Sequence, residues 1–157
     1  MRLEYFQLID RIVDLDLAGR TIVTEAQVPH ASTIFEGHFP GHPLMPGVLL
    51  TEAMAQTSGW LIIGVTGFTR MPFLAGITQA KLRTFVVPGQ LLTLKASLLH
   101  EGSGYAITKA SIAVDGKAVA DSEIKFKVMP FPDPRFRSSM GEVAQRIGFP
   151  VKEFENA

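Results

Sequence analysis

The 157-residue chain contains no cysteine. This absence excludes disulfide bonds, thiolate metal sites and a cysteine nucleophile, and it suits a reducing compartment. A serine nucleophile is not indicated either, because no serine sits in a Gly-x-Ser-x-Gly turn. The hydrophobic content of 46% and the charged content of 19% are typical of an ordinary globular protein. We therefore expect a folded chain whose chemistry depends on other side chains.

Basic residues are scarce in the first part of the chain. Residues 1–69 hold three Lys or Arg and seven Asp or Glu, whereas residues 70–157 hold twelve and eight. No Lys or Arg lies between Arg20 and Arg70. A nucleic-acid-binding protein would need a concentrated basic face, so we expect no nucleic acid partner. The basic excess of the second part fits either an acidic protein partner or solvated strand faces.

Signals for export or membrane insertion are also lacking. Acidic residues interrupt the first sixteen positions, where a signal peptide would be continuously apolar. The longest apolar run, 47–65, is long enough to span a bilayer, but it contains Glu52 and Gln56. A helix buried in a protein core explains this run better than a membrane span does. We expect a cytoplasmic protein without a membrane span.

Apolar periodicity and turn residues predict one long helix and an antiparallel sheet. A helical turn is expected at 4–10, β segments at 11–17 and 20–28, a helix at 46–65, and strands at 73–85, 91–100, 105–114 and 117–128. Asp115-Gly116 is a strong hairpin signal between the last two strands. A helix that is apolar nearly all round must be covered on most sides, and only a curled sheet is available to cover it. The sequence therefore predicts an α+β, hot-dog fold, in which a curled antiparallel sheet wraps around a long central helix.

The composition changes after Met129. Residues 130–157 hold four of the ten prolines of the chain. We therefore divide the chain into a hot-dog domain at 1–129 and a C-terminal extension at 130–157. The extension is expected to form loops and a short helix over 139–147.

The stretch GHFPGHPLMPGVLLTEAMAQ (37–56) carries a candidate base. Its three prolines make 37–46 an ordered loop and allow a helix to begin at Pro46. His38 lies on this rigid loop. A neutral imidazole with one nitrogen bonded to a backbone carbonyl presents the other nitrogen as a base. The alternative is a histidine that only packs the loop.

The same stretch carries a candidate acid. The helical neighbours of Glu52 include Val48, Leu49 and Ala55, and no Lys or Arg lies within seventeen residues. Burial without a cation favours the neutral form of a carboxyl group. A protonated Glu52 held by Gln56, one turn away, would be a general acid. The alternative is a buried glutamate that only bonds to backbone.

A metal site is not expected. His38 and His42 would present two ligands on one face of a helix, but Pro40 and Pro43 forbid that helix and no third ligand has a recognisable spacing.

Gly47 at the helix start adds a third functional group, because the first N–H groups of a helix lack intrahelical partners. A base, an acid and such a donor suit removal of a proton beside a carbonyl and loss of a β-hydroxyl.

The motif HFPGHPLMPGVLLTEAMAQ resembles the signature of the β-hydroxyacyl-acyl-carrier-protein dehydratases of FabZ type. The likeness extends over most of 3–129, including FQLIDRIVDLD, KLRTFVVPGQ and AVDGKAVADSEIKFKV. It implies a hot-dog fold, an obligate homodimer and a trimer of dimers, that is, a hexamer. It also implies that no cofactor or metal is used.

The resemblance assigns roles to individual residues. His38 matches the catalytic base and Glu52 the acid, and in the family the two come from opposite subunits. Gly47 matches the glycine whose N–H binds the thioester carbonyl. Leu44 matches the position whose carbonyl orients the histidine, and Gln56 the glutamine that supports the acid.

The implied substrate is a (3R)-hydroxyacyl chain on the phosphopantetheine arm of acyl carrier protein, and the products are a trans-2-enoyl chain and water. We expect an acyl tunnel along the helix, lined by Leu49, Met54, Trp60 and Phe85. We expect contacts to the acidic carrier from Arg70, Lys81 and Arg83. The segments RMPFLAGITQAK and LLHEGSGYAITKA resemble a proteobacterial subgroup associated with a specialised carrier protein and with very long acyl chains for lipid A. The reaction would then belong to fatty acid or lipid A acyl-chain synthesis.

Alternatives remain open for the activity and for the role of the extension. A hot-dog thioesterase could use the same folded dimer, although members of that group lack the His-Phe-Pro loop. A non-catalytic subunit could use the tunnel only to hold a chain on its carrier, although a pure binder has no need of Glu52. The sister group that also isomerises the double bond has Asp in place of Glu52, which favours dehydration alone here. The extension could cap the tunnel, contact a carrier or be an inert surface segment.

Overall fold

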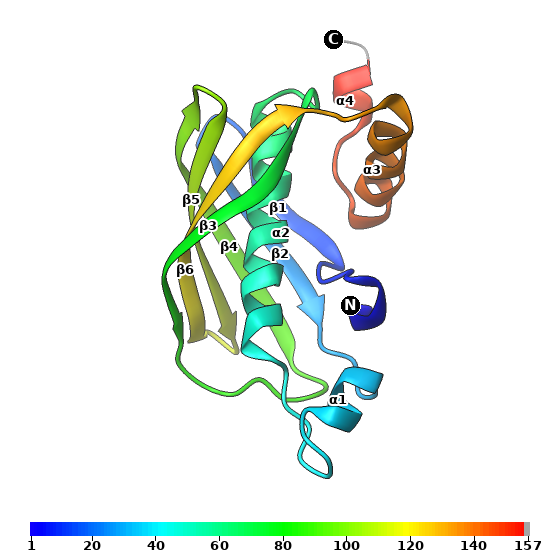
Figure 1. Cartoon of the computed structure of the whole chain (residues 1–157), viewed down its shortest axis with the longest axis vertical. Coiled ribbons are helices and arrows are strands. Elements are labelled where there is room, and N and C mark those ends of the chain that lie inside the picture. Colours follow the sequence, from blue (N-terminus) through cyan, green and yellow to red (C-terminus); the bar gives the residue numbers. More distant parts are fainter. Residues whose placement is uncertain (156–157) are drawn as a thin grey trace.

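The computed structural model describes residues 1–155, which form one antiparallel sheet around a long helix (Figure 1). The strands are β1 (Arg11–Asp16), β2 (Thr21–Gln27), β3 (Arg70–Leu82), β4 (Leu91–Gly102), β5 (Tyr105–Val114) and β6 (Lys117–Pro130). The helices are the 3-10 helix η1 (Leu3–Tyr5), α1 (Thr33–Gly37), α2 (Gly47–Val65), α3 (Pro134–Ile147) and α4 (Lys152–Glu155). The strand order is β1-β2-β4-β5-β6-β3.

Helix α2 is the centre of the core, and the sheet curls around it. Met54, Leu61 and Ile62 are completely buried. The length and apolar composition of α2 would suit a membrane span, but most of the helix is buried inside the fold. Such burial removes apolar surface from water, at roughly 25 cal/mol per Å². The predicted α+β hot-dog fold is confirmed.

Two hydroxyl pairs join α2 to the sheet. The Thr57 and Thr24 hydroxyl oxygens lie 2.9 Å apart, and Thr108 Oγ1 donates to Ser58 Oγ at 2.8 Å. All four side chains are buried. Because each has a partner, these polar groups do not destabilise the core.

The predicted hairpin between β5 and β6 is present. Asp115 and Gly116 have positive φ angles of 50° and 76°, as a two-residue type I′ turn requires. A register shift between Ile112 and Ala113 then places one extra residue on β6. As a result Val119 is buried together with Ala120, although strict alternation predicts that Val119 faces solvent.

Several segments differ from the sequence prediction before the extension. The helical turn expected at 4–10 is only the 3-10 helix η1 (Leu3–Tyr5). Helix α1 was not predicted, although Ser32 caps it by accepting from Ile34 N–H at 3.1 Å. Strand β3 ends at Leu82 rather than at Phe85. The chain leaves the sheet there, and Phe85 projects into solvent with an exposed fraction of 76%.

The C-terminal extension forms a longer helix than predicted. Helix α3 begins at Pro134, five residues before the expected start. The Asp133 side chain caps it by accepting from Phe136 N–H at 2.8 Å, and proline suits the first helical position. Gly148 ends the helix with a φ of 81°. The prolines therefore mark the start of a helix where we expected a loop.

The extension packs onto the helical core. The Phe149 ring lies 5.3 Å from the Trp60 ring and 5.8 Å from the Phe68 ring, between centroids. Arg137 Nε donates to the Phe68 carbonyl oxygen at 3.3 Å. Ile147 and Phe149 are buried. Figure 1 shows α3 and α4 beside α2, on the side away from β4 to β6.

We expect Asp133→Ala to lower the free energy of unfolding by about 1 kcal/mol, because α3 loses its N-terminal cap. Urea denaturation followed by circular dichroism measures the change. Ser138→Ala, at an exposed position within α3, is the control and should be close to neutral. Equal stability of Asp133→Ala and the unmodified protein would contradict the capping role.

Candidate active site

The loop after α1 holds His38 in one orientation. His38 Nδ1 and the Leu44 carbonyl oxygen are 2.9 Å apart, and Leu44 N–H donates to the His38 carbonyl oxygen at 2.9 Å. A carbonyl oxygen can only accept, so Nδ1 carries the proton and Nε2 has a free lone pair. The His38 ring also stacks on Phe39, with centroids 4.1 Å apart. This geometry equips His38 to accept a proton at Nε2.

Gly47 begins α2 beside this histidine. Met45 N–H donates to the Val86 carbonyl oxygen at 2.8 Å, which ties the loop to the segment after β3. Gly47 N–H belongs to the first helical turn and has no partner four residues earlier. A side chain at position 47 would collide with Leu82. The glycine therefore lets the Leu82 side chain pack against the start of α2, and both residues line the adjoining cavity.

The cavity beside His38 has a volume of about 480 Å³. It is lined by residues of the histidine loop, the start of α2 and the segment that follows β3: His38, Phe39, Leu44, Met45, Gly47, Leu50, Leu82, Arg83, Thr84, Phe85 and Val86.

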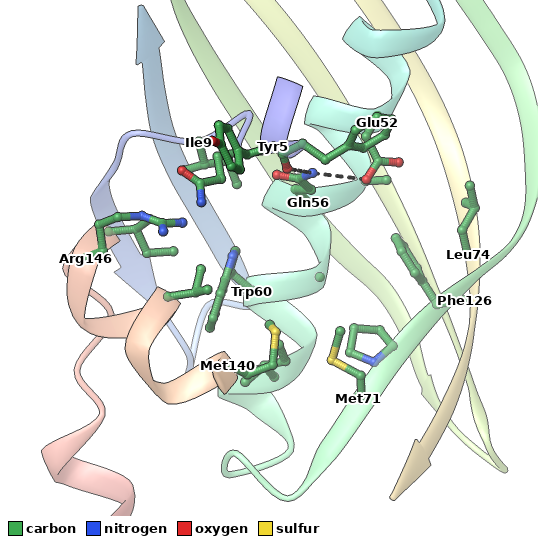
Figure 2. Close-up of a pocket in the computed structure, with 18 residues that line it drawn as sticks. Tyr5, Ile9, Glu52, Gln56, Trp60, Met71, Leu74, Phe126, Met140 and Arg146 are labelled. Carbon is green, nitrogen blue, oxygen red and sulfur yellow. Dashed lines mark hydrogen bonds between the residues drawn. The ribbon is translucent and has the colours of Figure 1, made fainter. Parts of the chain in front are cut away.

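Glu52 is half-buried on α2 and is held by Gln56 (Figure 2). Gln56 Nε2 donates to Glu52 Oε1 at 3.1 Å and to the Phe6 carbonyl oxygen at 2.8 Å. Leu8 N–H donates to Gln56 Oε1 at 3.2 Å. The two backbone contacts fix which end of the amide faces Glu52, because Phe6 O needs a donor and Leu8 N–H needs an acceptor. The carboxyl group is thus positioned by the N-terminal segment through Gln56.

Glu52 faces a second cavity, of about 370 Å³. Among the described residues, Glu52 does not line the His38 cavity, and His38 does not line the Glu52 cavity. The single chain therefore gives its candidate base and acid to different cavities, although they lie only fourteen positions apart in sequence.

The four candidate tunnel residues fall in three places. Trp60 lines the Glu52 cavity and Phe85 lines the His38 cavity. Leu49 and Met54 are buried in the core and are not among the described lining residues of either cavity. One chain therefore does not bring these four side chains together.

The candidate carrier-binding residues are divided as well. Lys81 and Arg83 lie near the His38 cavity, which Arg83 lines. Arg83 Nε also donates to Asp121 Oδ2 at 2.9 Å, which neutralises part of its charge. Arg70 begins β3, eleven residues before Lys81, and thus roughly 36 Å away along an extended strand.

The extension lines the Glu52 cavity, through side chains that were not named from the sequence. Met140, Val143 and Ile147 of α3 line it, together with Tyr5 and Phe6 from the N-terminal segment. The α3 residues recur at intervals of three and four, which is the apolar stripe of an amphipathic helix. This apolar stripe between a capping Asp133 and a terminating Gly148 is a pattern from which α3 could have been predicted.

Hydrogen bonds to the Glu4 side chain hold the segment that precedes His38. Glu4 Oε1 accepts from Ser32 Oγ at 2.6 Å, from Thr33 N–H at 3.0 Å and from Thr33 Oγ1 at 3.2 Å. These bonds favour the carboxylate, with the Ser32 hydroxyl as the largest cause, and lower the pKa of Glu4 to about 2. Glu4 therefore joins η1 to the start of α1, which precedes His38.

Metal ligands are not clustered in the part of the chain that the structure describes. Within residues 1–155, no group of three or more His, Asp or Glu side chains is placed to hold a metal ion.

A comparison with known protein families shows to which family the chain belongs. The FabA-like domain matches residues 2–123 of the chain. The chain belongs to the FabA-like family. Helices α3 and α4 lie outside the matched part, whereas η1, the His38 loop and α2 lie within it.

Three curated relatives within the FabA-like family have the same printed name, 3-hydroxyacyl-[acyl-carrier-protein] dehydratase FabZ. The protein from Ruminiclostridium cellulolyticum is 38% identical over 122 residues, covering 77% of this chain and 85% of the relative. The Syntrophotalea carbinolica protein is 39% identical over 127 residues, covering 80% and 86%. The Chlamydia trachomatis protein is 40% identical over 126 residues, covering 77% and 81%. FabZ-type membership is therefore shown.

Solved structures share the fold at low sequence identity. A hypothetical thioesterase with coenzyme A from Streptococcus pneumoniae has a TM-score of 0.62 and 15% identity, covering 76% of this chain and 85% of the other. A conserved protein from Pseudomonas aeruginosa has a TM-score of 0.61 and 23% identity, covering 80% and 91%. At these identities the likeness establishes the fold alone.

We expect the stabilising effect of Glu4 to depend on pH. Its folded-state pKa is lowered from 4.5 to about 2, so the contribution is fully present above pH 4.5 and is lost as the pH falls toward 2. The difference in unfolding free energy between the unmodified protein and Glu4→Gln should shrink over that range. Thermal or urea unfolding at several pH values measures it, with the exposed Glu36→Gln as the control. A difference in unfolding free energy that stays constant with pH would contradict the stabilising role of the Glu4 carboxylate.

Proposed function

We propose that the protein is a 3-hydroxyacyl-[acyl-carrier-protein] dehydratase of fatty acid synthesis, converting a (3R)-hydroxyacyl thioester to a trans-2-enoyl thioester and water. The observation that carries the proposal is the fixed orientation of His38, with Nδ1 bonded to Leu44 O and Nε2 free. It occurs in a chain that is 38–40% identical to curated FabZ proteins.

His38 is the proposed base. The proton on the carbon between the thioester carbonyl and the hydroxyl-bearing carbon moves to Nε2. The electron pair of the broken C–H bond forms the carbon–carbon double bond, and the C–O bond to the hydroxyl group breaks. The Leu44 carbonyl stabilises the resulting imidazolium, because it accepts from the protonated Nδ1.

Glu52 is the proposed acid. The protonated carboxyl group gives its proton to the departing hydroxyl, which leaves as water. Gln56 Nε2 then donates to the carboxylate that remains. Transfer of a proton from His38 to Glu52 through solvent restores the starting state, so the reaction consumes no cofactor.

Gly47 is the proposed donor to the thioester carbonyl. Negative charge develops on that oxygen as the proton leaves. An N–H group at the first turn of the long helix α2 meets this charge with the positive end of the helix dipole.

The proposed active site is shared between two subunits. The support is the placement of His38 and Glu52 in separate cavities of one chain. Strand β3 lies at the edge of the sheet, and its apolar side chains Leu74 and Leu82 are about half exposed, at 49% and 51%. Pairing of β3 edges between two copies would satisfy this edge and cover these side chains. A homodimer follows from this proposal, and the trimer of dimers stays a prediction.

The proposed substrate arrives on the phosphopantetheine arm of acyl carrier protein. Lys81 and Arg83 lie near the His38 cavity and suit an acidic carrier. Arg70 lies near the opposite end of β3, so we do not include it in this contact.

The thioesterase alternative has less support. The structures with thioesterase titles are 13–16% identical to this chain and speak only to the fold. A non-catalytic subunit that only holds an acyl chain would have no use for the hydrogen bond from Gln56 to Glu52.

We expect Glu52→Gln to lower dehydration by about 10²–10⁴-fold, because the amide has no acidic proton to give to the leaving hydroxyl. Enoyl product, free acid and unchanged thioester are measured after incubation with 3-hydroxyacyl carrier protein. The exposed Glu36→Gln is the matched control. Full turnover by a folded Glu52→Gln protein would contradict the assignment, and free acid from the unmodified protein would favour a thioesterase.

Mixed dimers test whether the site is shared. We expect His38→Ala and Glu52→Gln to be inactive separately. Random reassembly of equal amounts should recover about a quarter of the unmodified activity, because half of the dimers then contain one intact site of two. Steady-state dehydration after joint refolding measures the recovery. No recovery, with heterodimers verified by mass spectrometry, would place base and acid in the same chain.

A further inference from the structure

One face of α2 is left open by the sheet and forms the floor of the Glu52 cavity. Glu52, Gln56, Gly59 and Ile63 lie on this face, at helical intervals of four, three and four residues. The floor therefore runs for eleven residues along α2, or about 16 Å at 1.5 Å per residue. That length suits an extended fatty acyl chain rather than a short acid.

The two sides of this cavity come from distant parts of the chain. Met71 and Leu74 of β3 form one side, and Met140 of α3 lies on the other (Figure 2). Val143, one turn after Met140 on α3, also lines the cavity. The contact of Phe149 with Trp60 anchors the extension beside α2. The extension therefore encloses space that would otherwise open to solvent along α2.

The polarity of the floor changes along its length. Glu52 and Gln56 lie at one end, and the floor beyond them is formed by Gly59, Trp60 and Ile63. A Cβ at position 59 would lie 3.6 Å from Pro72 Cγ, so Gly59 faces Pro72 of β3 across the cavity lining. The arrangement places the Glu52 carboxyl group at one end and a mostly apolar lining beyond it, in which Arg146 of α3 is a charged member.

We propose that α3 is the outer wall of the acyl-chain site, so that the C-terminal extension sets a preference for long acyl chains. The inference rests on the proposed function, because it takes Glu52 to be the reacting end of the cavity. The family match ends at residue 123, so the wall lies outside the part of the chain that the FabA-like family shares. Val143 is the specificity-determining residue that the structure assigns.

Trp60 provides a direct readout. It is the one tryptophan of the chain and lines the cavity eight residues after Glu52, about 12 Å along the helix. Palmitoyl-pantetheine brominated in the middle of its chain should quench Trp60 fluorescence on binding. Unbrominated palmitoyl-pantetheine should reverse the quenching, whereas butanoyl-pantetheine should not.

Val143→Phe fills the wall of the cavity. We expect it to weaken palmitoyl-pantetheine binding by tenfold or more, since each excluded methylene costs about fourfold in affinity. The value of KM for a 3-hydroxypalmitoyl substrate should rise with kcat unchanged, and the constants for a 3-hydroxybutanoyl substrate should stay within about twofold. Gln145→Phe, at an exposed position of α3 that is not among the described lining residues, is the matched control. Thermal unfolding verifies that each variant is folded, and Met140→Phe replaces Val143→Phe if the latter is not.

Several outcomes would overturn the inference. Equal losses with short and long chains would mean that Val143→Phe acts through structure alone. Unchanged binding of the long chain, or no quenching of Trp60 because a second copy covers the cavity, would also overturn it. Quenching does not require turnover. A protein that binds the long chain as expected but forms no enoyl product would therefore contradict the proposed function and support the role of α3.

Discussion

The burial of α2 is the constraint on which the rest of the structure depends. A helix that is apolar on almost every face is unstable in water unless other elements cover it. The curled sheet covers most of α2, and hydroxyl pairs from Thr57 and Ser58 satisfy the polar groups that enter the core. Because the sheet cannot close completely, one face of α2 remains open, and Glu52 lies on that face.

The candidate acid and base are positioned by neutral groups, a backbone carbonyl for His38 and a side-chain amide for Glu52, rather than by charged partners. Leu44 fixes His38, and Gln56, itself held by the N-terminal segment, fixes Glu52. Neutral partners of this kind orient a titratable group without locking it in its charged form, as a countercharge would. A site that must exchange a proton at each step benefits from this arrangement.

The C-terminal extension lies outside the part of the chain that matches the FabA-like family. The fold, the histidine loop and α2 lie in the matched part, 2–123. Helix α3 lies outside it and packs through Phe149 and Ile147 onto the core. The division at residue 129 remains our proposal for where the hot-dog domain ends. The extension is an integral part of the packed structure, and so the interpretation as an inert surface segment is not favoured.

Local pattern was sufficient for much of this protein. The prolines of 37–46, the continuous apolar run after Gly47 and the alternation in β6 predicted the rigid loop, the central helix and the sheet, because each depends on neighbours close in sequence. The same stretch indicated His38, Glu52, Gly47 and Gln56 as the chemical groups. The start of α3 was placed wrongly because the caps around it were read as loop signals.

Tertiary structure alone decided how these groups are shared between cavities. His38 and Glu52 are neighbours in sequence, yet the turn into α2 sends them into different cavities. Arg70 and Lys81 belong to one strand, yet its extended length separates them. The wall that α3 adds beside Trp60 joins segments some eighty residues apart. Sequence specified the chemistry and the local elements, whereas packing specified which surfaces face one another, since that depends on contacts between distant segments.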